Sequence, residues 1–110
     1  GTVVILGDVG DNFAAGMTGG MAFIYDKSRE LEKKINPESV VWQSVETDYW
    51  INFLMKLLKE HFEETESKIS KKMINNFNEE VKNFIQVCPK EMLNKLKNPI
   101  SFKSKIKQVS

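Results

Sequence analysis

The sequence predicts an α+β chain in which the strands of a stacked β-repeat come first and helices follow. Residues 1–6 and 20–25 are similar apolar segments that start with glycine and lie 19 positions apart. Glycines punctuate the segment between them, as expected for the turns of a repeat. Further along, apolar residues recur at three- and four-residue spacing, the period of an α-helix. This order is typical of proteins whose β and α parts are separate.

The first 26 residues are predicted to form two strands and glycine turns. Residues 3–6 and 22–25 are continuous apolar runs, which favours strands covered on both faces. The pair Gly19 and Gly20 argues against a helix between them. We expect the two strands to pair in parallel as adjacent rungs. A rung cannot bury its apolar side alone, so self-association through the open rung is expected for the isolated chain.

A charged loop, a third strand and a helix are predicted next. Residues 26–38 form the loop, and residues 40–42 form a short strand about one repeat after Phe23. Residues 44–62 are the clearest helix, which Ser44 or Thr47 can cap. Its apolar stripe consists of Trp50, Phe53, Leu54, Leu57, Leu58, His61 and Phe62.

A second helix is predicted to begin near Thr65 or Ser67 and to end at Pro89, with a short helix from there to about Lys97. Its stripe consists of Ile69, Met73, Phe77, Val81 and Phe84. We expect the two long helices to pack as an antiparallel pair and to cap the terminal rung around Phe23, Tyr25 and Trp42.

The predicted division is therefore residues 1–43 for the rungs and their connecting loop, 44–97 for the helical cap, and 98–110 for a basic flexible tail. The tail carries Lys103, Lys105 and Lys107, and no acid follows Glu91. A solvated, frayed tail is the expected state, and an arm that contacts nucleic acid or membrane is the alternative.

Composition indicates one soluble globular domain. The chain has 110 residues, of which 41% are hydrophobic and 28% charged, and its formal net charge is +1. So small a net charge gives no overall field to attract nucleic acid or acidic lipid, so neither is an expected partner. The single Cys88 allows no internal disulfide, and no signal peptide or membrane span is recognised, so the cytoplasm is the expected compartment.

No arrangement of residues amounts to an active site, so catalytic, cofactor-binding and metal-binding residues are each predicted as none. The spacing of Gly7, Gly10 and Gly16 does not fit a dinucleotide-binding loop. His61 is expected to be packed or interfacial, and Cys88 to be a small buried apolar residue. A nucleophilic pair of the two is the alternative, although no third group is indicated.

Two further clusters have structural interpretations. The carboxylates of Glu63, Glu64 and Glu66 are expected to be solvated in a polar connection between helices. The aromatic residues Trp42, Tyr49 and Trp50 are expected to anchor the strand-to-helix junction and not to form a ligand cage.

The motifs resemble a known family. The sequence Asn-Phe-Ala-Ala-Gly-Met-Thr-Gly-Gly-Met-Ala at residues 12–22, together with residues 1–7, resembles the closing turns of the glycine-repeat domain of the glutamate synthase large subunit. Residues 36–40, 61–67 and 84–89 are similar to later motifs of that family and follow in the same order.

The resemblance implies the end of a right-handed parallel β-helix, about two rungs, followed by a C-terminal helical cap. In that family the region is a non-catalytic scaffold in an oxidoreductase of glutamate biosynthesis and ammonia assimilation. It lies between the amidotransferase domain and the synthase domain that holds FMN and an iron–sulfur cluster. The resemblance thus implies no cofactor in this segment and, as partners, the remaining domains of the enzyme, in the same chain or a separate one.

Other interpretations remain open. Lys82 stands where the family often has a proline, so a more continuous helix is expected. With only about two rungs, the chain is expected to be a fragment or truncated remnant. A stand-alone β-repeat interaction module is the alternative function, and an independent enzyme using Cys88 and His61 is a third.

Overall fold

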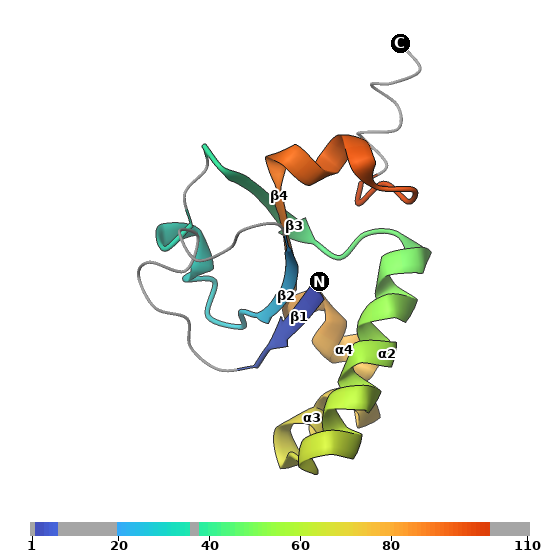
Figure 1. Ribbon diagram of the computed structural model, residues 1–110. Helices are drawn as coiled ribbons and strands as arrows, with labels where there is room; N and C mark the ends of the chain where they lie inside the picture. The colour runs from blue at the N-terminus through green and yellow to red at the C-terminus, as the bar shows by residue number, and fades with distance from the viewer. Residues whose placement is uncertain (1, 7–19, 36–37, 102–110) are drawn as a thin grey trace.

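The computed structural model describes residues 2–6, 20–35 and 38–101, which form a mixed sheet with helices packed against one face (Figure 1). The strands are β1 (Thr2–Ile5), β2 (Met21–Tyr25), β3 (Val40–Ser44) and β4 (Phe84–Pro89). Their order across the sheet is β1-β2-β4-β3. Strand β1 is parallel to β2, whereas β4 is antiparallel to both of its neighbours.

The parallel pairing of the first two strands is confirmed, with the register that the repeat predicts. Thr2 lies opposite Met21 and Ile5 lies opposite Ile24, so each residue pairs with the one 19 positions later. Equivalent side chains of the two copies therefore point to the same face of the sheet. The predicted glycine turns at residues 7–19 lie outside the described residues.

The predicted right-handed parallel β-helix is wrong, because the four-stranded sheet is mixed and open. The residues responsible are 84–89, which were expected to continue and end a helix. They form β4, all six residues of which are buried, and β4 pairs antiparallel with β2 along the edge that a further parallel rung would need. Strand β3 exists as predicted but pairs with β4, not with β2.

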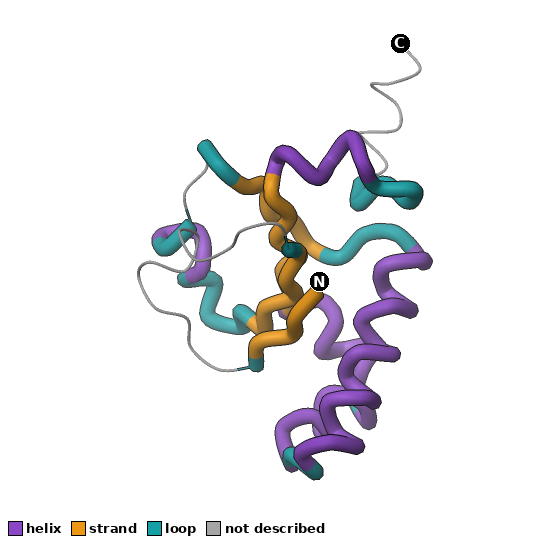
Figure 2. Tube along the Cα trace, viewed as in Figure 1, coloured by secondary structure: helices purple, strands orange, loops and turns teal. Residues whose placement is uncertain are grey.

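The helices agree with the prediction only in part, and Figure 2 shows where they lie along the chain. Helix α2 (Asp48–Thr65) is capped by Thr47, whose Oγ1 accepts a hydrogen bond from the Trp50 backbone N–H at 3.4 Å. Helix α3 (Lys68–Asn75) is capped by Ser67 and folds back onto α2.

The second predicted helix is not continuous. After Asn76 the chain forms α4 (Phe77–Glu80), then the 3₁₀ turn η2 (Val81–Asn83), which contains Lys82, and then β4. Two further 3₁₀ segments are η1 (Leu31–Lys33), in the predicted loop, and η3 (Lys90–Lys95), where a short helix was expected.

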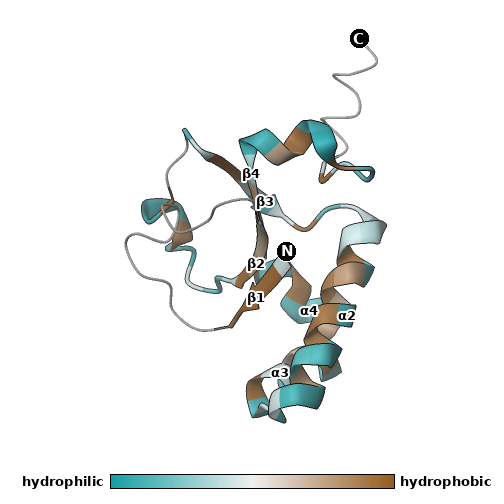
Figure 3. Cartoon of the chain, in the orientation of Figure 1, coloured by the Kyte–Doolittle hydropathy of each residue, from teal (hydrophilic) through white to brown (hydrophobic). Residues whose placement is uncertain are grey.

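Two hydrophobic clusters lie on opposite faces of the sheet, and Figure 3 shows that β1 is strongly apolar while the helices alternate. The helix-side cluster consists of Met21, Phe23, Val45, Trp50, Leu54, Leu58, Met73, Phe84, Cys88 and Ile100. The opposite cluster consists of Ala22, Ile24, Leu31, Ile35, Val40, Ile85 and Val87. The alternation along β4, with Phe84 and Cys88 on one face and Ile85 and Val87 on the other, places this strand between both cores.

The helices therefore cover Phe23 and Tyr25 as predicted, but Trp42 packs on the opposite face, against the second cluster. The centre of the α2 stripe is Trp50, Leu54 and Leu58, which are buried. The neighbouring stripe residues are only partly buried, because they lie at the margin of the face that meets the sheet.

Candidate functional site

The thiol of Cys88 is a buried group of the helix-side core. Cys88 is buried on β4, and its Sγ donates to the carbonyl oxygen of Pro89 at 3.4 Å. Burial raises the pKa of the thiol from 9.0 to about 11, because the charged thiolate loses its hydration. At neutral pH the group is therefore protonated and inaccessible.

His61 and the carboxylate run lie on α2 and just after it. His61 is partly buried, and its backbone carbonyl accepts a hydrogen bond from Thr65 Oγ1 at 2.8 Å. Glu63 and Glu64 are exposed, and Glu66 ends the helix with a left-handed backbone (φ 51°). Within the described part of the chain, no group of three histidine, cysteine or carboxylate side chains is placed to hold a metal ion.

An aromatic cluster joins the start of α2 to the sheet. Tyr49 meets Trp50 edge-to-face at 4.8 Å between ring centroids and stacks on Phe53 at 6.2 Å. Phe23 of β2 lies 6.3 Å from both Trp50 and Phe53. The anchor predicted for Tyr49 and Trp50 is thus present, but Trp42 lies across the sheet from it.

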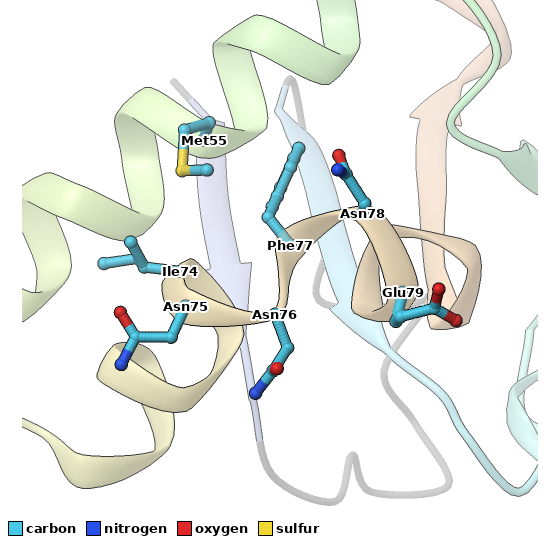
Figure 4. Close-up of a pocket in the computed structure, with 7 residues that line it drawn as sticks. All are labelled: Met55, Ile74, Asn75, Asn76, Phe77, Asn78 and Glu79. Atoms are coloured by element: carbon cyan, nitrogen blue, oxygen red, sulfur yellow. The ribbon is translucent and has the colours of Figure 1, made fainter.

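An open groove of about 460 Å³ lies where α2 meets the α3–α4 junction (Figure 4). Met55, Ile74 and Phe77 form its apolar part, and Figure 4 shows Asn75 and Asn76 pointing away from α2. The ionisable lining residue is Glu79, whose carboxylate lies 3.9 Å from the ammonium of Lys82. These groups can pack against a ligand and form hydrogen bonds with it.

Two glutamines that the sequence analysis overlooked lie side by side on the helix face. Gln43 of β3 is the register partner of Gln86 of β4. Gln43 Nε2 donates to the backbone carbonyl of Ile100. Gln86 is fully buried; its Nε2 donates to Met21 Sδ at 3.1 Å, and its Oε1 has no partner among the described residues. A polar residue inside an apolar strand was the available indication, and the helical interpretation of that segment hid it.

The outer edge of β1 is the exposed feature best suited to binding. Among the described strands, β1 and β3 each have a neighbour on one side only. The side chain of Val3 is 54% exposed, while Val4 packs against the helix-side cluster. Helix α2 contacts β1 and presents Tyr49, which is 46% exposed. An edge strand that is fixed to the sheet and helix offers backbone groups for pairing with another strand.

Comparison with known proteins identifies the family. The GXGXG motif family matches residues 1–90. Glutamate synthase (NADPH) large chain of Azospirillum brasilense is 49% identical over 100 residues, which are 91% of this chain and 7% of that protein. Glutamate synthase (NADH) of Schizosaccharomyces pombe is 41% identical over 83% of this chain and 4% of that protein. Ferredoxin-dependent glutamate synthase of Spinacia oleracea is 39% identical over 81% of this chain and 6% of that protein.

The matched segment therefore covers most of this chain but only a small part of each relative's length. None of the described helices is long and apolar enough to cross a membrane. The chain belongs to the GXGXG motif family, and it is similar to a small segment of the large chain of glutamate synthase.

Proposed function

We propose that the chain is a non-catalytic scaffold segment of a glutamate synthase, an enzyme of glutamate biosynthesis. The observation that carries the proposal is identity of 39–49% over most of this chain to a segment that makes up 4–7% of these much longer enzymes. A buried, protonated Cys88 and exposed carboxylates agree with a structural role. FMN and the iron–sulfur cluster belong, in this proposal, to other parts of the enzyme.

The names of the relatives support a role that is separate from electron supply. They specify NADPH, NADH and ferredoxin as electron donors, and the same segment matches all three. A region that binds the donor is expected to differ among such proteins, whereas a region that holds domains together is not. The segment therefore serves, in our proposal, a task common to all three.

The outer edge of β1 is the proposed docking site for the remaining domains, in the same chain or as a separate chain. Strand addition supplies a row of main-chain hydrogen bonds without a preformed pocket. The exposed Val3 lies on this edge, and the contact with α2 keeps β1 in an extended, ordered state. The cytoplasm is the proposed compartment, and the division at residues 43 and 97 remains a prediction.

The test uses two variants that are matched in exposure. Val3→Lys places a charge on the proposed docking edge, and Ile69→Lys places one on α3 at a residue that is 52% exposed. In a full-length glutamate synthase, the corresponding segment is replaced by this chain carrying either substitution. The amount of soluble, assembled enzyme and the activity per assembled molecule are then measured. We expect Val3→Lys to reduce assembly and Ile69→Lys to leave it unchanged, with activity per assembled molecule equal in both.

Two results separate this proposal from its rival. If the isolated chain binds the rest of the enzyme poorly and Val3→Lys has no effect on assembly, the docking edge is wrong. If the chain captures no part of glutamate synthase yet associates with itself through Val3, measured by light scattering, a stand-alone interaction module is the better description.

A further inference from the structure

The segment after η3 is held in place by side chains from two other elements. The chain leaves η3 at Leu96 with extended dihedral angles (φ −79°, ψ 131°). The indole Nε1–H of Trp50 is shared between the carbonyl oxygens of Asn98 (3.1 Å) and Pro99 (3.2 Å). Gln43 Nε2 donates to the next carbonyl, that of Ile100. Three successive backbone carbonyls are thus bound by side chains far away in sequence.

The same segment also fills an apolar site. The side chain of Ile100 is 2% exposed and belongs to the helix-side cluster, and Ser101 is buried as well. Figure 1 shows this segment beside the end of β3 and the start of α2. Gln43 lies on the first of these elements and Trp50 on the second. The site therefore combines two hydrogen-bond donors with a pocket for one branched aliphatic side chain.

This combination is the chemistry by which proteins recognise short peptide segments. Main-chain hydrogen bonds supply affinity, and a pocket for a particular side chain supplies selectivity. Pro99 suits such a ligand, because its ring fixes φ and removes a backbone N–H that would need a partner. When the segment leaves, Gln43 and Trp50 lose these carbonyl acceptors and their donors need another partner.

We propose that Gln43 and Trp50 form a peptide-recognition site for an Asn-Pro-Ile-Ser segment, which the chain fills with its own residues 98–101. The match to the GXGXG motif ends at residue 90, so the ligand lies beyond the matched region while both donors lie within it. The inference does not depend on the scaffold function proposed above. It makes residues 98–101 a releasable strap that covers the Trp50 end of the core.

The first test compares two glutamines that are register partners. Gln43→Met removes a donor to the strap, and Gln86→Met removes one that donates to Met21 instead. Trypsin cleavage after Lys97, an exposed residue next to the strap, requires the strap to open. We expect Gln43→Met to speed this cleavage by about 3- to 10-fold, the effect of one lost hydrogen bond, and Gln86→Met to leave it unchanged. Equal rates in the two variants would overturn the proposal.

The second test fills the site in trans. Ile100→Asp places a charge in the apolar pocket and is expected to release the strap in the full-length chain. A capped synthetic peptide of residues 96–101 is then titrated while the fluorescence of Trp50 is followed, in a Trp42→Phe background. Saturable binding to Ile100→Asp, at least about tenfold tighter than to the chain with its own strap, supports the proposal.

Two controls test whether peptide binding depends on Gln43 and whether the Ile100→Asp chain folds. Adding Gln43→Met to Ile100→Asp must weaken peptide binding, because the peptide then lacks a donor for its Ile carbonyl. Binding that is equal in both, or no binding to a folded Ile100→Asp chain, contradicts the site. If circular dichroism shows that Ile100→Asp does not fold, the cleavage comparison of the two glutamine variants decides the question.

Discussion

The two halves of the sheet differ in strand direction and in their relation to the sequence repeat. The β1–β2 half is parallel and keeps the 19-residue offset of the repeat, whereas the β4–β3 half is antiparallel and joins segments with no sequence similarity. Residues of β1 are mostly only partly buried, but every residue of β4 is buried. The comparison teaches that the first copy of the repeat, β1, forms an edge of the sheet, while β4, which lies outside the repeat, forms a buried inner strand beside the second copy, β2.

The largest expected effect separates these halves directly. Phe84 of β4 is fully buried and meets Tyr25 edge-to-face at 5.3 Å, so we expect Phe84→Ala to reduce the free energy of unfolding by about 3–5 kcal/mol. Val3 of β1 is exposed, so Val3→Ala is expected to change it by less than about 0.5 kcal/mol. Urea titrations of both variants make the comparison, and similar losses would contradict the assignment of β4 as a buried inner strand and of β1 as an exposed edge strand.

The next effect concerns the helix α2, which packs against the sheet. Leu58 of α2 is fully buried, and we expect Leu58→Ala to cost about 2–5 kcal/mol. Its neighbour Leu57 is only partly buried, so Leu57→Ala is expected to cost clearly less. The same urea titrations test the order of the two variants, and a larger loss for Leu57→Ala would mean that α2 is rotated relative to the sheet.

A pH-dependent effect follows from the buried thiol of β4. The pKa of Cys88 is raised by burial to about 11, above its unfolded value of 9.0. Stability from the neutral thiol is therefore fully present below pH 9 and is lost as the pH rises toward 11, by about 2–3 kcal/mol. Unfolding measured at pH 8 and pH 11 should show this loss in the wild-type chain and a smaller one in Cys88→Ala. An unchanged slope in Cys88→Ala would show that another group is responsible.

The smallest effect concerns the contact between β2 and α4. The Tyr25 hydroxyl donates to Glu80 Oε2 at 2.8 Å, and burial, followed by this bond to the Glu80 carboxylate, raises the pKa of Tyr25. We expect Tyr25→Phe to cost about 1 kcal/mol, because Glu80 loses a hydrogen bond in a partly buried position. Tyr49→Phe, at an exposed tyrosine, is the control and should have almost no effect. Thermal unfolding resolves the difference, and equal midpoints would contradict the role of this bond.

Local features of the sequence were sufficient for part of the fold. The Thr47 cap and the apolar stripe of α2 are encoded within a few residues, and the repeat itself specifies the pairing of β1 with β2. Strand β4 was missed because the spacing from Met73 to Phe84 fits a helical face. Pro89 ends a strand as readily as it ends a helix. Its partners lie about 60 residues away for β2 and 45 for β3, and such pairing leaves no local pattern.

The candidate sites show the same limit. The family motifs within residues 1–90 were recognisable from the sequence, and the comparisons confirm them. The contacts of Gln43 and Trp50 with residues 98–100 were not, because they join three separate elements. Composition assigns residues 98–101 to a flexible tail. It cannot indicate that hydrogen-bond donors from distant parts of the sequence bind this segment.

Hydrogen exchange is the most direct test of whether the outer edge of β1 docks against the rest of the enzyme. Exchange of the backbone amides of residues 2–5 is measured in the isolated chain and after addition of a glutamate synthase large chain from which the corresponding segment has been removed. We expect slower exchange in β1 on addition, with exchange in β3 and α3 unchanged, because the new strand pairs only at the β1 edge. Unchanged exchange in β1, or new protection confined to β3, would contradict it.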